Sequence, residues 1–275
     1  MADTFYIPKG FRAAGLYCGI KKAKKDLSLI ISDAPASAAG VFTQNKVCAA
    51  PVVLSKERVM SGRGIRAIIT NSGNANACTG NDGLLHARQM AQAIADELDC
   101  DESAVLVSST GVIGQTLPVQ KIEAAAPAIV KECSTDNFAT AAEAIMTTDT
   151  FPKIASEQLV LNGDTITILG MAKGSGMIAP NMATMLGYIC TDARIGHSTL
   201  QKMLSYVNER SFNSITVDGD TSTNDMVLLL ANGAASNNDI VENSNEYNIF
   251  LSHLESVSRS LAQMIVRDGE GATKF

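Results

Sequence analysis

The sequence predicts an α/β or α+β protein in which short buried strands alternate with amphipathic helices. Its 275 residues are 46% hydrophobic and only 18% charged, with 21 glycines and no tryptophan, a composition typical of globular domains. Short apolar runs bounded by Gly, Pro, Asp or Asn indicate strands, and longer stretches with apolar residues at helical spacing indicate helices. No repeat, low-complexity tract or linker interrupts this alternation, so we predict no domain break.

In the first half of the chain, strands are expected at 27–31, 52–54, 65–70 and 104–107. A helix over 84–98 is predicted because its apolar residues recur every three or four positions. Pro118 suits the first turn of a helix over 119–126, and Pro127 should break or kink the helix at its end. A further helix is expected over 138–145.

The second half opens with a hairpin over 159–169, because Asn162 and Gly163 supply the positive φ angles that a tight type I′ turn requires. A short apolar strand over 185–190 comes next. We then expect a helix over 200–207, strands at 215–217 and 227–230, and a long amphipathic helix over 250–266.

Composition also excludes some classes of function. The formal net charge of -6 argues against a general nucleic-acid surface, and the only basic run, residues 21–25, is interpreted as a solvated turn. No signal peptide or membrane-spanning stretch is recognisable, which predicts a cytoplasmic protein without membrane partners. The six cysteines form no C-x-x-C pair, so we expect reduced, mostly buried thiols rather than zinc ligands or disulfides.

The stretch 173–188 combines chain-bending residues with one hydroxyl placed directly before the apolar strand. That hydroxyl belongs to Thr184. At a turn-to-strand junction, packing can hold backbone strain, and a Thr Oγ there is close enough to attack the preceding carbonyl, that of Ala183. Such an attack would cut the chain and leave an α-amine with a reference pKa near ~7.7–8.0, able to act as base for the same hydroxyl. The residue pattern alone favours the simpler alternative, a β-branched Thr packing on a sheet.

Other polar segments are ambiguous by themselves. Residues 108–114 place hydroxyls and backbone N–H groups after a strand, but without the spacing of a nucleotide-binding loop. Residues 70–80 are turn-forming, and residues 145–153 place hydroxyls and a carboxylate before a proline. Residues 217–225 have the acidic look of a calcium loop, but Thr223 and Leu229 replace the required Gly and Glu. We therefore predict no metal there, nor at the three isolated histidines.

These segments resemble those of the ornithine acetyltransferase family, also called glutamate N-acetyltransferases. The segment Lys-Gly-Ser-Gly-Met-Ile-Ala-Pro-Asn-Met-Ala-Thr-Met-Leu is similar to the family's self-cleavage segment, and the segments at 70–80, 108–114, 145–153 and 267–275 match as well. The resemblance implies cleavage between Ala183 and Thr184, with Thr184 as the N-terminal nucleophile. It further implies an oxyanion hole and substrate contacts: Thr110 and Gly111 hold the oxyanion, Thr147 contacts substrate, Lys173 pairs with the substrate α-carboxylate, and Glu270 pairs with the distal amine of an ornithine-like substrate.

The resemblance also implies a fold, an assembly and a reaction. The fold is a four-layer, N-terminal-nucleophile-like sandwich of two mixed sheets between helices. The assembly is a heterotetramer of two α chains (1–183) and two β chains (starting at 184, here to 275), and the family's C-terminal portion is expected to be missing.

The implied enzyme moves an acetyl group from N-acetylornithine to glutamate through acetyl-Thr184, in arginine biosynthesis. It needs no cofactor, although some members also accept acetyl-CoA as acetyl donor. Two alternatives stay open. A self-cleaving aminopeptidase or amidase would use the same nucleophile with water as acceptor, and a catalytically inactive binding protein would not split at all.

Overall fold

The computed structural model describes residues 5–176, 185–219 and 221–271. Within them, hydrogen-bonded strands follow the order β4-β3-β2-β8-β7-β6-β5, with β1 paired to β2. Their bounds are β1 Phe11–Leu16, β2 Leu27–Phe42, β3 Ile65–Asn74, β4 Val105–Val112, β5 Lys153–Leu161, β6 Asp164–Lys173, β7 Leu186–Thr191 and β8 Met226–Ala231.

The long strand β2 divides this array into two sheets. Its first part pairs antiparallel with β1 and β3, the register shifts between Ile31 and Ala36, and its second part pairs antiparallel with β8 from Ser37 onward. A bulge of this kind bends a strand and increases its twist, so the two parts of β2 belong to different sheets. Both sheets are mixed, because β3 and β4 are parallel and β7 and β8 are parallel.

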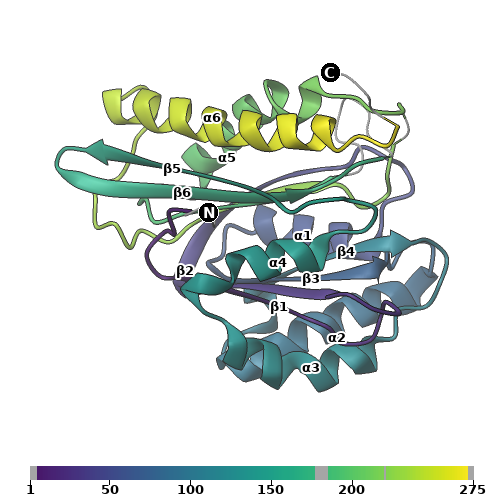
Figure 1. Ribbon diagram of the computed structural model, residues 1–275. Coiled ribbons are helices and arrows are strands. Elements are labelled where there is room, and N and C mark those ends of the chain that lie inside the picture. The colour runs from purple at the N-terminus through teal and green to yellow at the C-terminus, as the bar shows by residue number, and fades with distance from the viewer. Residues whose placement is uncertain (1–4, 177–184, 220, 272–275) are drawn as a thin grey trace.

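Helices cover both outer faces and make four layers (Figure 1). Helices α5 (His197–Glu209) and α6 (Asn245–Arg267) lie on the sheet that contains β5 and β6, while α2 (Gly80–Leu98) and α3 (Val119–Glu132) lie on the sheet that contains β3 and β4. Helix α4 (Phe138–Ile145) packs between the sheets, and α1 (Ala50–Met60) packs against β4 and α2. The expected sandwich of two mixed sheets between helices is confirmed.

Three apolar clusters fill the spaces between these layers. The middle cluster joins the facing sides of the two sheets and includes Phe11, Ile30, Leu106, Tyr188 and Leu228. Because each sheet buries both faces, its strands appear in the sequence as nearly continuous apolar runs rather than alternating ones.

Most predicted elements are confirmed, including the hairpin. Asn162 and Gly163 have φ angles of 52° and 97°, and Leu161 pairs with Asp164 across the turn, as a type I′ turn requires. No helix in the described ranges is long and apolar enough to cross a membrane.

Three predictions about secondary structure are wrong. Residues 52–54 belong to helix α1, whose first turn contains Pro51; a run of three apolar residues does not distinguish strand from helix, whereas Pro is favoured at a helix start. The helix predicted to end at 126 continues through Pro127 to Glu132, because buried side chains on both sides of the proline pack on the sheet; the expected break is therefore wrong, and a kink at Pro127 stays a prediction. Residues 215–217 form no strand but come directly after a 3-10 turn, with Ile215 and Val217 packed against the core.

The prediction of mostly buried thiols is also wrong. Only Cys133 and Cys190 are buried, Cys18 and Cys100 are half-buried, and Cys48 and Cys78 are exposed. All six are free thiols. Burial raises the pKa of Cys133 to about 12.

Candidate active site

A pocket of about 580 Å³ opens where the ends of β4 and β6 approach the loops after α4 and α6. This volume suits a small metabolite. Every site residue predicted from the sequence that lies in the described part of the chain lines it: Thr110, Gly111, Thr147, Lys173 and Glu270. Residues separated by up to 160 positions in the sequence thus face one cavity.

The predicted cleavage residues Ala183 and Thr184 lie outside the described residues. The next described residue, Met185, donates its backbone N–H to Asp225 Oδ1 at 2.9 Å. Its carbonyl accepts from Met226 N at 3.2 Å. These bonds attach the start of β7 to the start of β8.

The end of β4 has a backbone that only glycine accommodates. Gly111 has a φ of +134°, and a Cβ added there would lie 2.3 Å from the carbonyl carbon of Gly73 on β3. Asn224 closes the same region, since its Nδ2 donates to the carbonyls of Ala75 at 2.7 Å and Ser109 at 2.9 Å. The backbone beside Thr110 and Gly111 is therefore fixed by close packing and by an amide that joins two strand ends.

Lys173 provides a buried cation in the pocket wall. Its side chain is only 3% exposed, and its Nζ donates to Thr147 Oγ1 at 3.2 Å. Burial lowers the pKa of Lys173 below its ordinary value, although nearby Asp149 and Asp225 carboxylates favour the charged form. A cation in so dry a place interacts strongly with an anionic ligand, because little water screens it.

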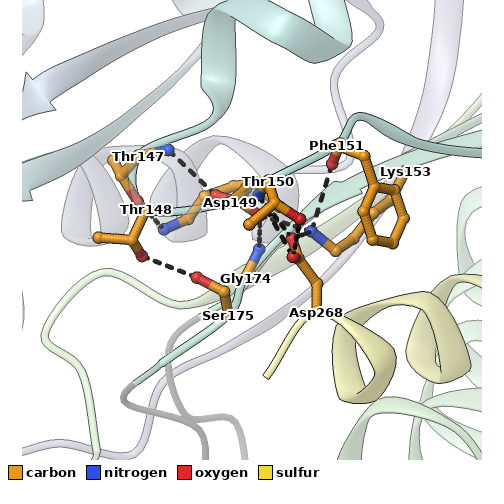
Figure 2. Close-up of polar contacts among 10 residues, drawn as sticks. Thr147, Thr148, Asp149, Thr150, Phe151, Lys153, Gly174, Ser175 and Asp268 are labelled. Carbon is orange, nitrogen blue, oxygen red and sulfur yellow. Dashed lines mark hydrogen bonds and ion pairs between the residues drawn. The ribbon is translucent and has the colours of Figure 1, made fainter. Parts of the chain in front are cut away.

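Asp149 holds the backbone at Thr147 and directly after Lys173. Its Oδ2 accepts from Thr147 N at 3.0 Å, and its Oδ1 accepts from Gly174 N at 2.6 Å (Figure 2). Burial alone would raise the pKa of Asp149, but Lys173, Lys153 and these hydrogen bonds hold it below its usual value. The loop after α4 and the end of β6 are thus joined through one ionised carboxylate.

Lys153 connects this carboxylate to helix α6. Its Nζ lies 2.7 Å from Asp149 Oδ1 and 2.6 Å from Asp268 Oδ2, with all three side chains at most 1% exposed (Figure 2). Asp268 also accepts from the backbone N–H of Thr150 at 3.0 Å. Three segments that border the pocket therefore meet in a buried ion cluster, which we define as Asp149, Lys153 and Asp268.

Glu270 lies just past this cluster, at the mouth of the pocket, and is exposed. Its backbone N–H donates to the carbonyl of Ser175 at 2.7 Å. A Cβ at Gly176 would lie 2.9 Å from the Glu270 carboxyl carbon, so this carboxylate sits directly over glycine backbone. Ser175 is held in turn by a 2.7 Å hydrogen bond with Thr148.

Several pocket residues were not predicted from the sequence. The acidic loop after α5 contributes Asp218, Ser222 and Asn224, and the turn-forming segment 70–80 contributes Gly73 and Ala75. The sequence argues against a calcium site in the acidic loop and indicates turns in 70–80, without assigning a site residue in either segment. Lys21 was interpreted as part of a solvated turn, but it is half-buried and lines the pocket; nothing in the local sequence separates it from its exposed neighbours.

Comparison with known proteins identifies a family to which this chain is similar. The protein-family model described as "ArgJ family" matches residues 12–275 of this chain. The arginine biosynthesis bifunctional protein ArgJ of Chlorobaculum tepidum is 52% identical over 275 residues, which is 100% of this chain and 68% of that protein. The protein of the same name from Thermotoga neapolitana is 52% identical over 270 residues, which is 98% of this chain and 68% of that protein.

Solved structures give the same result. The crystal structure of the bifunctional protein argJ from Bacillus halodurans superposes with a TM-score of 0.61 at 44% identity, covering 64% of this chain and 92% of that chain. Ornithine acetyltransferase complexed with ornithine, from Mycobacterium tuberculosis, superposes at 0.55 and 37% identity, covering 65% and 93%. An L-aminopeptidase D-Ala-esterase/amidase from Ochrobactrum anthropi, a variant of the Ntn hydrolase fold, superposes at 0.53 with 10% identity, covering 97% and 88%; this likeness shows a shared fold alone.

Proposed function

The chain belongs to the ArgJ family, and from that premise we propose that it transfers an acetyl group from N-acetylornithine to glutamate in arginine biosynthesis. One observation carries this proposal: those residues selected by the family resemblance that the structure describes come from four separate segments and line a single pocket of about 580 Å³. The pocket offers a buried cation, Lys173, to pair with a carboxylate, and an exposed carboxylate, Glu270, to pair with an amine. An ornithine derivative carries both a carboxylate and an amine.

In the proposed first step, Thr184 Oγ attacks the acetyl carbonyl of N-acetylornithine while its own α-amine takes the hydroxyl proton. The tetrahedral oxyanion is stabilised by the Thr110 hydroxyl and the Gly111 backbone N–H. The rigid backbone around Gly111 supports this role, because donors that are already in place need no reorganisation as charge develops. The C–N bond then breaks, the proton passes to the departing amine, and ornithine leaves an acetyl ester on Thr184.

In the second step, the amine of glutamate attacks the ester carbonyl and loses a proton to the Thr184 α-amine. The C–O bond to Thr184 breaks, the Oγ recovers the proton, and N-acetylglutamate departs. In both steps Lys173 would pair with the substrate α-carboxylate and Thr147 would contact substrate, a role supported by the 3.2 Å bond between them. Glu270 would pair with the distal ammonium of ornithine.

The same Thr184 hydroxyl would first cut the chain at Ala183, giving an α chain of 1–183 and a β chain that starts at 184. We further propose the heterotetramer of two α and two β chains, a cytoplasmic location, and no cofactor other than acetyl-CoA as a second acetyl donor. Since the chain spans 68% of its relatives' length, we propose that the remaining third supplies further substrate contacts, and activity is to be measured in the complete protein.

The test uses Thr184→Ala and Thr184→Ser in the complete protein. We expect Thr184→Ala to stay uncut and inactive, and Thr184→Ser to split and transfer more slowly in parallel. Intact mass spectrometry measures the cut, and incubation with N-acetylornithine should add an acetyl group to the peptide that begins at 184. A Thr184→Ala protein that still splits before residue 184, or still exchanges acetyl groups, would refute the proposal.

An aminopeptidase or amidase on the same fold would release the acyl group to water. Incubating the wild-type protein with N-acetylornithine, with and without glutamate, separates the two reactions. A transferase forms N-acetylglutamate in step with ornithine. Ornithine and free acetate released at the same rate without any acceptor would favour the hydrolase instead.

A further inference from the structure

Lys21 reaches the pocket from the loop between β1 and β2. Its Nζ donates to the carbonyl of Met146 at 2.6 Å and to that of Lys25 at 3.0 Å. Its side chain passes over Gly73, where an added Cβ would lie 2.9 Å from Lys21 Cγ. In the β3–β4 ladder Gly73 is opposite Gly111, so the stem of Lys21 lies beside the strand that pairs with Gly111, and Lys21 lines the same pocket as Gly111.

The loop holds Lys21 in this position. Asp26, which is fully buried, accepts from the backbone N–H of Lys21 at 2.8 Å and of Cys18 at 2.6 Å. The neighbouring Lys22 and Lys24 have no such anchor and are exposed. One lysine of the basic run is therefore placed at the pocket by a buried carboxylate, while its neighbours are solvated.

Lys21 and Lys173 both line this wall of the pocket. Lys21 bonds the carbonyl of Met146, and Lys173 bonds the hydroxyl of the next residue, Thr147. Burial lowers the pKa of Lys21, and the positive charge of Lys173 adds to that effect against the opposing charge of Asp26. An anion bound between the two cations would stabilise both charges, because each one repels the other in a poorly screened site.

An ammonium has three protons to donate, and Lys21 uses two of them on backbone carbonyls. Among the described residues no third partner is found, so one donor remains for a ligand. Lys173 is already the partner proposed for the α-carboxylate that both amino-acid substrates share. Lys21 is therefore available for a second anionic group, which glutamate has and ornithine lacks.

We propose that Lys21 binds the side-chain carboxylate of the glutamate acceptor and so selects glutamate over uncharged acceptors. This inference rests on the proposed acetyl transfer. The two substrates occupy the pocket in turn, and the ends of their side chains carry opposite charges. Glu270 at the mouth suits the ammonium of ornithine, and Lys21 at the wall suits the carboxylate of glutamate.

The test compares Lys21→Met and Lys21→Gln with Lys22→Met in the complete protein. Gln retains an N–H donor for the carbonyls of Met146 and Lys25, so it removes the charge with little disturbance of the loop. Lys22→Met makes the same charge change one residue away, at an exposed position outside the pocket. Denaturant midpoints of all three verify folding.

Two reactions are measured. Exchange of acetyl groups between N-acetylornithine and labelled ornithine needs no glutamate and reports the proposed function by itself. Transfer to glutamate and to glutamine reports the acceptor. We expect both Lys21 variants to raise KM for glutamate about 10- to 100-fold, as for a lost hydrogen bond to a charged group. The preference for glutamate over glutamine should fall by a similar factor, with a much smaller change in the exchange rate and none in Lys22→Met.

Three results would overturn the inference. An unchanged KM for glutamate in Lys21→Gln would do so, as would a fall in exchange as large as the fall in glutamate transfer. In a separate assay with acetyl-CoA as donor, a loss confined to that reaction would show that Lys21 serves the donor's phosphates instead. If the wild-type protein catalyses no exchange at all, the proposed function fails first and this inference fails with it.

Discussion

Replacing Lys153 with methionine removes the cation at the centre of the buried ion cluster. The Nζ of Lys153 lies 2.7 Å and 2.6 Å from carboxylate oxygens of Asp149 and Asp268, and its side chain is fully buried. Methionine fills similar space but leaves two carboxylates close together in a dry environment. The perturbation is therefore mainly electrostatic rather than a cavity.

The expected loss of stability is about 3–5 kcal/mol, the range found when one partner of a buried ion pair is removed. The lower end applies here, because Asp149 keeps two backbone N–H donors and Asp268 keeps those of Thr150. For a chain of this size each kcal/mol shifts Tm by roughly 2–4 °C, so a loss of about 3 kcal/mol should lower Tm by roughly 6–12 °C. Transfer activity should fall as well, because Asp149 positions the backbone at Thr147 and directly after Lys173.

Urea and thermal unfolding measure the effect, and Lys202→Met is the matched control. Lys202 pairs with Glu242 at the surface, with side chains 54% and 44% exposed, and such solvent-screened pairs contribute little to stability. Adding Asp268→Asn to Lys153→Met removes one unpaired charge, so this double variant should be more stable than the single one. A single variant that loses no more than Lys202→Met, or a double variant that is less stable still, would refute the electrostatic reasoning.

Three further predictions concern the pocket. Gly111→Ala should lower the free energy of unfolding by at least ~3 kcal/mol, because a Cβ would lie 2.3 Å from Gly73. The control Gly163→Ala has a positive φ but open space around it, so it should cost only ~1–2 kcal/mol. Equal losses of stability in the two variants would contradict the clash at Gly111. Glu270→Gln should leave self-cleavage intact while raising KM for N-acetylornithine about tenfold or more, so a block of cleavage would contradict its proposed role. Since the pKa of Asp149 is depressed in the folded state, its contribution to stability should be present above the ordinary carboxyl pKa near ~3.9 and lost as pH falls through the lower folded value. The urea midpoints of Asp149→Asn and wild type should therefore converge below about pH 4. A difference between the two midpoints that stays constant with pH would count against this.

Local patterns predicted most of the elements because those signals depend on neighbouring residues. The positive φ angles at Asn162 and Gly163 and the helical spacing in α2 are properties of a few consecutive residues. The errors at 52–54 and Pro127 arose where tertiary packing decided between alternatives that local propensity leaves nearly equal. The extension of β2 beyond Ile31 into a second sheet was not predicted, because Ser32, Asp33 and Pro35 interrupt its apolar run where the register shifts.

The predicted site residues were found through resemblance, and their arrangement came from contacts between distant segments. Lys153 and Asp268 are 115 residues apart, as are Asn224 and Ser109, and Lys21 and Met146 are 125 apart. No window of consecutive residues contains both members of such a pair, so no periodicity or spacing rule indicates it. What the sequence did indicate, a carboxylate among hydroxyls in 145–153, was the local half of the ion cluster.

The site contains two kinds of residue. Thr147, Lys173 and Glu270 face the pocket, whereas the buried ion cluster lies behind them and acts on the backbone that carries them. A change at one of these three side chains should alter KM or kcat with little change in stability, while a change in the cluster should alter both, because the same bonds that fix the pocket also join β5, β6 and α6. Measuring stability and kinetics on the same set of variants therefore tests the structural assignment of each residue independently of its proposed chemistry.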